Sequence, residues 1–152
     1  MVEFKLSEQQ LMLKNMAKDF VEKELKPVAA ELDRKQDPKE CFSWDLLRKA
    51  SKLGLRTMTL PEEWGGMNAD ILTRVVLGEE LAVGDLGFTV CLDQIWKICS
   101  MICHLSTDEQ KQRFLPAFRD DDEYVLSICV TEPGSGSDGI LPYENPDYGI
   151  KT

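Results

Sequence analysis

The chain has 152 residues, of which 43% are hydrophobic and 30% charged, a composition typical of a globular domain and not of a disordered segment. Its formal net charge is −9 and it has no cluster of Lys and Arg, which disfavours nucleic-acid binding because such clusters neutralise phosphates. No run approaches the roughly 18 consecutive apolar residues that cross a bilayer, and the first residues do not resemble a signal peptide. We therefore expect no nucleic-acid partner and no membrane span.

The first helix is marked by a capping box at its start. Ser7 and Gln10 stand three residues apart, so that each side chain can bond a backbone N–H at the helix start. Apolar residues then recur at three- and four-residue spacing as far as Leu25, and helical residues resume after Pro27. We expect one long helix that ends before Asp37, with Pro27 as the candidate position of a kink.

A second helix is expected over residues 44–53. Ser43 is a suitable N-cap for it, and Gly54 is a suitable end. The stretch that follows is predicted to be a turn, because Pro61 interrupts any helix and Gly65-Gly66 allow unusual backbone angles.

Two more helices follow the turn. Asp70 begins one that runs to about Val83. The next spans roughly residues 88–103 and is apolar on nearly all sides, a pattern typical of a helix buried at the middle of a bundle.

The last helix and a strand complete the expected elements. Ser106 and Glu109 form a second capping box, and the short helix that they begin is expected to end at Leu115-Pro116. Residues 124–130 are rich in β-branched and aromatic side chains and predict a strand. A lone strand leaves its backbone polar groups unpaired, so the β-structure of this chain is expected to be incomplete.

Several motifs occur in an order that resembles one family. After the predicted strand, residues 131–138 read T-E-P-G-S-G-S-D and match the signature T-E-P-x-x-G-S-D without substitution. Residues 60–66 (LPEEWGG) resemble a P-E-x-x-G-G turn, and residues 79–81 (EEL) match an E-E-L segment. Residues 106–116 (STDEQKQRFLP) resemble G-T-x-E-Q-K-x-x-x-L-P, with Ser106 in place of Gly. Together they identify the chain as resembling the acyl-CoA dehydrogenase family over essentially its whole length.

The resemblance implies a mainly α fold. Residues 1–122 are expected to form the N-terminal all-helical domain of the family, and residues 123–152 the first strand and loop of its middle β-domain, left incomplete. The family's C-terminal four-helix bundle has no counterpart in these residues. Residues 140–149 look like an insertion after the signature, which puts the local geometry on the substrate side in doubt.

The activity implied by the resemblance is FAD-dependent oxidation of an acyl-CoA thioester to the 2,3-enoyl-CoA, with the hydride going to flavin N5. The chemistry needs a carboxylate base and donors that stabilise charge on the thioester oxygen. In the family that glutamate lies in the C-terminal bundle, so no catalytic residue is assigned here and the 152 residues alone are expected to be inactive. Glu132 belongs to the signature and is not given that role.

The cofactor contacts implied by the resemblance are Ile128, Cys129, Val130, Thr131 and Ser137. The residues themselves agree with this assignment: the Thr131 hydroxyl can hydrogen-bond a flavin ring, and Ser137 can hydrogen-bond the pyrophosphate or the pantetheine arm of the substrate. The neighbouring glycines leave backbone N–H groups free to face an anion. The alternative is a tight turn in which Thr131 and Ser137 only cap the backbone.

No metal site is expected. Cys99 and Cys103 stand one helical turn apart, next to His104, the only histidine. They form a possible zinc or redox pair, but buried reduced cysteines are the favoured interpretation because no second pair completes a site. Asp120-Asp121-Asp122 is interpreted as a solvated loop, and no G-x-S-x-G motif supports a hydrolase.

The partners implied by the family are an acyl-CoA substrate, an electron-transfer flavoprotein as acceptor, and further copies of the same chain in a dimer or tetramer. We expect a bacterial cytoplasmic location in preference to the mitochondrial matrix. The acyl group is not determined; plausible lining of its pocket comes from Leu77, Ala82, Val90, Ile95 and Ile98.

Three hypotheses remain open for the chain as it stands. It is a portion of a full-length dehydrogenase, or one subunit of a split dehydrogenase, or a non-catalytic helical module for protein–protein contact. The first two predict exposed apolar surface where further domains dock, whereas the third predicts a closed polar surface.

Overall fold

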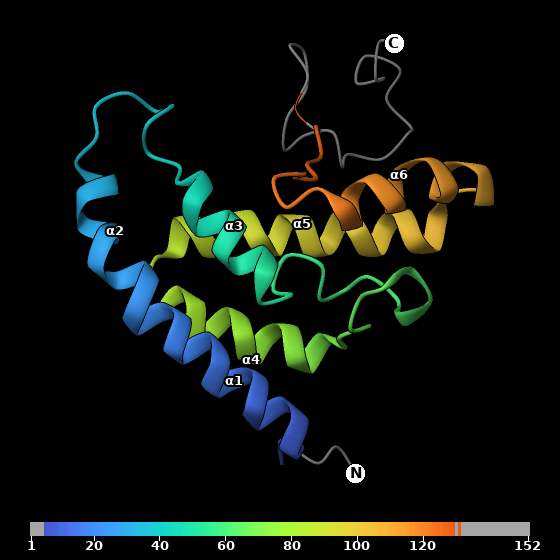
Figure 1. Ribbon diagram of the computed structural model, residues 1–152, viewed down its shortest axis with the longest axis horizontal. Helices are drawn as coiled ribbons and strands as arrows, with labels where there is room; N and C mark the ends of the chain where they lie inside the picture. Colours follow the sequence, from blue (N-terminus) through green and yellow to red (C-terminus); the bar gives the residue numbers. More distant parts are fainter. Residues whose placement is uncertain (1–4, 130, 132–152) are drawn as a thin grey trace, which may run out of the picture.

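The computed structural model describes residues 5–129 and residue 131, and in that part of the chain the fold is helical (Figure 1). The six α-helices and two short helices of other types are α1 (Glu8–Phe20), the π-helix η1 (Val21–Leu25), α2 (Lys26–Asp33), α3 (Trp44–Lys52), the 3-10 helix η2 (Glu62–Trp64), α4 (Ile71–Ala82), α5 (Leu86–Leu105) and α6 (Asp108–Asp120). Figure 1 shows α1, η1 and α2 as one long rod, with α4 alongside α1; α4 also packs against α5, and α6 contacts η2. The expected helical architecture is confirmed.

The long rod contains a π-helical turn where a kink was expected. The N–H of Lys26 bonds the carbonyl of Val21, five residues earlier, instead of the usual four. Pro27 follows immediately; it has no N–H, and in a regular α-helix its ring would clash with the carbonyl of Lys23. The wider π turn lies directly before this proline and keeps the rod continuous, as π-bulges within α-helices do.

The turn after α3 depends on two glycines that the sequence singled out. Gly65 has φ 88°, a left-handed angle that side chains rarely allow, and ends η2. At Gly66 an added Cβ would lie 2.1 Å from the carbonyl oxygen of Leu60, so no other residue fits without moving the backbone. Both observations confirm the turn predicted for residues 55–66.

The core forms where α1, α4 and α5 pack together with α3. Leu25, Leu47, Leu81 and Leu92 are fully buried, as is Trp96, whose indole N–H donates to the carbonyl of Leu55 at 2.7 Å. This hydrogen bond ties α5 to the turn after α3 at the centre of the molecule. Burying apolar area of this kind is the main stabilising contribution to the fold.

Helix α5 is buried on one side only, which differs from the prediction. Phe88, Leu92 and Ile95 face the core, whereas Val90 and Leu105 are exposed to 47% and 77%. Within the described residues α5 is the one helix long and apolar enough to cross a bilayer. This is weak evidence for a membrane span, because the core helix of a globular protein has the same length and composition. Its apolar outer side has no covering element in the described part of the chain.

Helix α6 departs from the prediction at both ends. Its cap is Thr107, which forms a capping box with Gln110, and not Ser106 with Glu109. The N–H of Ser106 bonds the carbonyl of Ile102, so Ser106 ends α5 and the cap moves on by one residue. At the other end the helix continues past Pro116 to Asp120, and its buried side chains Leu115 and Phe118 hold that end to the core.

Residues 124–129 form no strand in the described structure. A strand needs a partner for its backbone groups, and none of the described residues supplies one. The alternation of a strand is nevertheless present, since Tyr124 and Leu126 are half-buried while Val125 and Ser127 are exposed. Val130, the last residue of the predicted strand, lies outside the described residues, and the division at residue 122 stays a prediction.

Candidate functional site

An open apolar groove of about 560 Å³, called here the α5 groove, lies between α5 and residues 125–127. Phe42 forms one wall: it packs edge-on against Trp44 at 5.1 Å between ring centroids and is stacked with Phe88 at 6.5 Å. The full lining is Pro38, Lys39, Phe42, Trp44, Val90, Cys91, Gln94, Ile95, Val125, Leu126 and Ser127. Such a surface can accommodate an apolar chain, with the Gln94 amide and Lys39 ammonium as its polar groups.

A second groove of about 490 Å³, the α4–α5 groove, runs between those helices. Its walls are mainly apolar and include Val75, Ala82 and Val90. The Arg74 guanidinium lies 3.6 Å from the Asp93 carboxylate, and its buried Nε has no hydrogen-bond partner. Asp93 also pairs with Lys97. The mainly apolar groove is therefore bordered by both acidic and basic side chains.

The expected pocket lining is only partly found in these grooves. Val90 belongs to both, Ile95 to the α5 groove and Ala82 to the α4–α5 groove. Leu77 is fully buried in the core and lines neither, because it faces inward from α4. Ile98 is half-buried and lines neither.

The predicted cofactor contacts lie directly after the wall of the α5 groove. Ile128, Cys129 and Thr131 are exposed to solvent, and Ile128 is 49% accessible. Val130 and Ser137 lie outside the described residues. The structure therefore places three of the five residues at an open surface, one to four positions beyond Ser127, and their role as flavin contacts stays a prediction.

The family model for the acyl-CoA dehydrogenase N-terminal domain matches residues 7–122. This chain belongs to the acyl-CoA dehydrogenase family. The mitochondrial isobutyryl-CoA dehydrogenase of Dictyostelium discoideum is 35% identical over 134 residues, which are 88% of this chain and 31% of that protein. The chain thus spans about a third of the length of the curated relatives that it matches.

Solved structures agree with this family assignment. The butyryl-CoA dehydrogenase of Megasphaera elsdenii superposes with a TM-score of 0.76 at 28% identity, covering 90% of this chain and 36% of that one. An acyl-CoA dehydrogenase of Bacillus anthracis, solved as a complex with FAD, superposes with a TM-score of 0.77 at 28% identity, covering 91% and 23%. The helical arrangement of this chain is therefore that of the family's N-terminal domain.

Sequence analysis missed a buried arginine in this acyl-CoA dehydrogenase domain. Arg56 is 1% exposed, and its guanidinium donates to backbone carbonyls around the end of α6. The available signal was its position in the run LGLRTMTL, where a charge stands among residues that pack inward. Nearby, the Thr59 hydroxyl donates to the carbonyl of Trp96 at 3.2 Å, which adds a second polar link between this turn and α5.

Of the two α5 cysteines that were predicted to be buried, Cys99 is buried and Cys103 is half-buried. Cys99 is fully buried, and burial raises its pKa to about 12. Burial also raises the pKa of Cys103, so both thiols are protonated at neutral pH and are poor nucleophiles or metal ligands. Among the described residues no group of three His, Cys, Asp or Glu side chains is placed to hold a metal ion.

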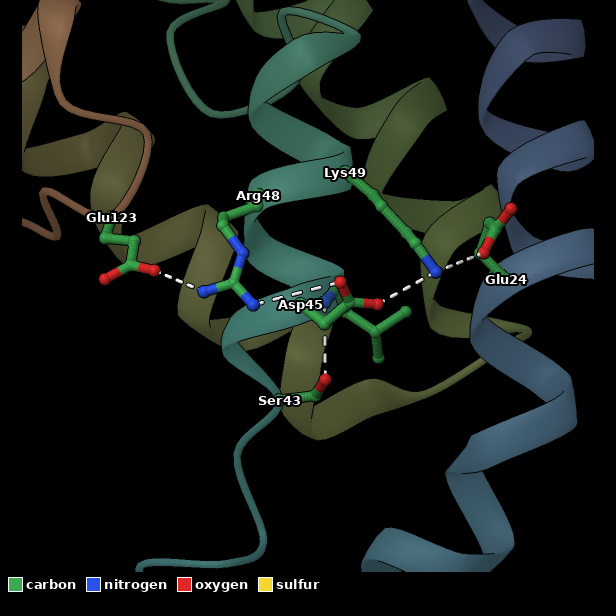
Figure 2. A network of polar contacts seen from close by, with 7 residues as sticks. Glu24, Ser43, Asp45, Arg48, Lys49 and Glu123 are labelled. Atoms are coloured by element: carbon green, nitrogen blue, oxygen red, sulfur yellow. Dashed lines mark hydrogen bonds and ion pairs between the residues drawn. The ribbon is translucent and has the colours of Figure 1, made fainter.

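Ion pairs on α3 connect that helix to both ends of the domain (Figure 2). Lys49 lies 2.8 Å from Glu24 of η1 and 2.8 Å from Asp45. Arg48 pairs with Glu123, beyond α6, and lies 3.8 Å from Asp45. The hydrogen bond from Lys49 lowers the pKa of Asp45, and the same contact, followed by that from Glu24, raises the pKa of Lys49.

Proposed function

We propose that this chain is the N-terminal portion of an FAD-dependent acyl-CoA dehydrogenase, which oxidises an acyl-CoA thioester to the 2,3-enoyl-CoA. The observation that carries the proposal is the match of residues 7–122 to the family's N-terminal domain, followed at residues 131–138 by an intact T-E-P-x-x-G-S-D signature. The names of the relatives support an acyl-CoA as substrate.

Five residues are proposed to hold the flavin: Ile128, Cys129, Val130, Thr131 and Ser137, of which Ser137 also meets the substrate. The exposure of the described ones supports this role, because each is open to a ligand. Bound FAD supplies the acceptor for the substrate's hydride. Residues 125–127, which form one wall of the α5 groove, directly precede these residues in the sequence. The groove offers apolar surface to an acyl chain.

The remaining partners are proposed on the same basis. An electron-transfer flavoprotein is the proposed acceptor; a solved structure of the electron-transferring flavoprotein of Acidaminococcus fermentans matches 90% of this chain with a TM-score of 0.75 at 34% identity. A dimer or tetramer and a cytoplasmic location are proposed from the family. The catalytic base is proposed to lie in a C-terminal domain, outside these 152 residues.

The exposed apolar side chains help to decide between a portion of a dehydrogenase, on one chain or two, and a non-catalytic helical module. Ile71, Val75, Leu86 and Val90 are between 47% and 74% exposed along α4 and α5. This favours a domain that docks onto further parts of a dehydrogenase, on one chain or two, over a helical module with a closed polar surface. A full-length enzyme and a split enzyme both remain compatible with it.

A chimera tests the proposal. Residues 1–152 are fused to the part of the Megasphaera elsdenii butyryl-CoA dehydrogenase that they do not match, and the purified protein is desalted after mixing with FAD. We expect a stoichiometric flavin band and reduction of a dye acceptor by butyryl-CoA, whereas the 152 residues alone should retain no flavin. Supplying the two parts as separate chains tests the split arrangement.

Matched variants separate cofactor binding from folding. Thr131→Val in the chimera is expected to reduce retained flavin because it removes the proposed hydrogen bond to the ring. Ser127→Ala, exposed in the same segment, should retain flavin normally. A folded chimera without flavin would contradict the proposed function; normal flavin retention by the Thr131 variant would contradict only that contact.

A further inference from the structure

The backbone at the end of α6 and in the turn after it is hydrogen-bonded to one buried side chain, that of Arg56. Arg56 donates from Nη1 to the carbonyl of Phe118 at 2.6 Å and of Tyr124 at 3.1 Å, and from Nη2 to the carbonyl of Arg119 at 3.4 Å. Three carbonyls that lie up to six residues apart in the sequence are thus held by a single guanidinium. Arg56 is only 1% exposed, so water does not compete for these bonds.

A serine extends this arrangement to the middle of the turn. The Nε of Arg56 donates to the hydroxyl of Ser51 at 2.9 Å, and that hydroxyl donates to the carbonyl of Asp122 at 2.8 Å. Ser51 lies on α3 and Arg56 in the turn after it, so both anchors belong to the core side. We call Arg56 with Ser51 the carbonyl clamp.

The charge of Arg56 is compensated without a carboxylate in hydrogen-bond contact among the described residues. The last carbonyls of α6 carry the negative end of the helix dipole, where a cation is stabilised. Burial lowers the pKa of Arg56, while the nearby Asp122 and Asp121 raise it, and a guanidinium stays charged in either case. The guanidinium carbon Cζ of Arg56 also lies 4.6 Å from the centre of the Phe118 ring, which makes a cation–π contact.

The clamp sets the direction in which the chain leaves the helical domain. Residues 125–127 follow the last clamped carbonyl directly and form one wall of the α5 groove. Ile128 to Thr131, the proposed flavin contacts, come next along the same backbone. In this stretch the described residues form no strand ladder that would fix the path; the hydrogen bonds at the end of α6 and the packing of Leu126 against the core hold it.

We propose that Arg56 is a positioning residue, which fixes the segment that carries the flavin contacts by holding the backbone carbonyls of residues 118–124. The assignment of that segment to flavin rests on the proposed function, whereas the clamp itself is defined by the contacts above. Lysine cannot replace Arg56, because an ammonium lacks the planar fork that reaches carbonyls on two sides.

Hydrogen exchange on the 152-residue chain tests the clamp without any flavin. Arg56→Lys is expected to speed exchange of two amides, those of Asp121 and Tyr124, which donate to the carbonyls of Ala117 and Asp121. The increase should be on the order of tenfold or more, since several bonds to a charged donor are lost. Amides of α1 and α4, far from the clamp, should exchange at the wild-type rate. Ser51→Ala, a milder change, should raise exchange at the same turn by a smaller factor.

Arg48→Met is the matched control, because Arg48 also reaches the turn, through Glu123, but on the exposed surface. It should leave the turn's exchange nearly unchanged. Unchanged exchange at Asp121 and Tyr124 in both clamp variants would overturn the proposal, as would a uniform rise over α1, α4 and the turn in Ser51→Ala. If Arg56→Lys does not fold, the Ser51 variant decides.

The flavin-binding chimera separates the two proposals. If the clamp variants loosen the turn and also lower flavin retention, both proposals stand together. If the turn loosens but the wild-type chimera holds no flavin, the clamp is real and the function assigned to its segment is wrong. Retention unaffected by a loosened turn would overturn the positioning role.

Discussion

The packing of α1 against α4 and the turn after α6 differ in what fills them. Between the two helices and α5 lie apolar side chains such as Leu25 and Leu81, both fully buried. At the turn the buried centre is the guanidinium of Arg56, ringed by backbone carbonyls. Apolar packing is set by volume and tolerates shifts, whereas a charged group in a carbonyl ring requires every bond to be made.

This difference indicates that the two regions contribute different properties to the domain, namely stability and backbone direction. The helical layer supplies stability mainly through apolar area removed from water. The turn supplies direction, since its hydrogen bonds fix named carbonyls from residue 118 to residue 124. Substitutions in the two regions should therefore differ in kind as well as in size.

The largest effect is expected in the helical layer. Leu81→Ala leaves a cavity at a fully buried position on α4 and should lower the free energy of unfolding by about 2–5 kcal/mol. Urea denaturation followed by circular dichroism measures it. Val83→Ala, two residues further along the chain and 65% exposed, is the control and should be nearly neutral. Equal losses in the two variants would contradict an apolar core here.

At the turn, Phe118→Leu is expected to lower the unfolding free energy by about 1–3 kcal/mol, because it removes the cation–π contact and the edge-on packing against Tyr124. Phe114→Leu provides a matched control at a half-buried site, where Arg113 lies over the ring at 5.3 Å, and should cost less. Should the two variants lose the same stability, the buried guanidinium would have no special part in the turn.

Alkaline pH probes Cys99, which lies between the two regions on α5. Its pKa is raised from 9.0 to about 12 in the folded state, so above pH 9 the unfolded chain loses a proton that the folded chain keeps. Stability should therefore fall as pH rises from 9 towards 12, by at most about 1.4 kcal/mol per pH unit from this group. Urea midpoints at pH 8 and pH 10 measure the slope, and Cys99→Ala should flatten it. Parallel slopes would show that other groups cause the loss.

The smallest effect is expected on the surface of α3. Lys49→Met removes two ion pairs that are open to solvent, and stability near neutral pH should hardly change. Lys49 holds the pKa of Asp45 below its ordinary value, so the pair's contribution is present above pH 3.8 and is lost as pH falls through the folded-state pKa. The variant should thus lose less stability than the wild type during acid titration. Identical acid titrations would show that the pair contributes nothing.

Most helix starts could be predicted because a cap is a local device. Ser7 with Gln10, Ser43 and Asp70 each bond backbone groups within three residues, and the structure confirms all three. The cap of α6 was misplaced by one residue because Ser106 and Thr107 both fit the pattern. Only the end of α5 decides between them, and that end depends on packing.

The predicted site residues illustrate the limit of local patterns. A motif names Thr131 and Ser137 as flavin contacts, but which surface they face depends on residues far from them in the sequence. Arg56, which holds the backbone ahead of that motif, lies 62 and 68 residues from the carbonyls of Phe118 and Tyr124. No periodicity or spacing links such positions, so the clamp could not be predicted.

The sequence by itself determined the helical class, most helix boundaries and the family resemblance, because capping boxes, apolar periodicity and ordered motifs are short-range properties of the chain. Tertiary structure alone decided that α5 buries only one side, that the described residues 124–129 form no strand, and that Pro27 is preceded by a π turn. Each of these depends on which partner is present in space. The burial of a helix face, the pairing of a strand and the backbone around a proline all depend on the residues packed against them.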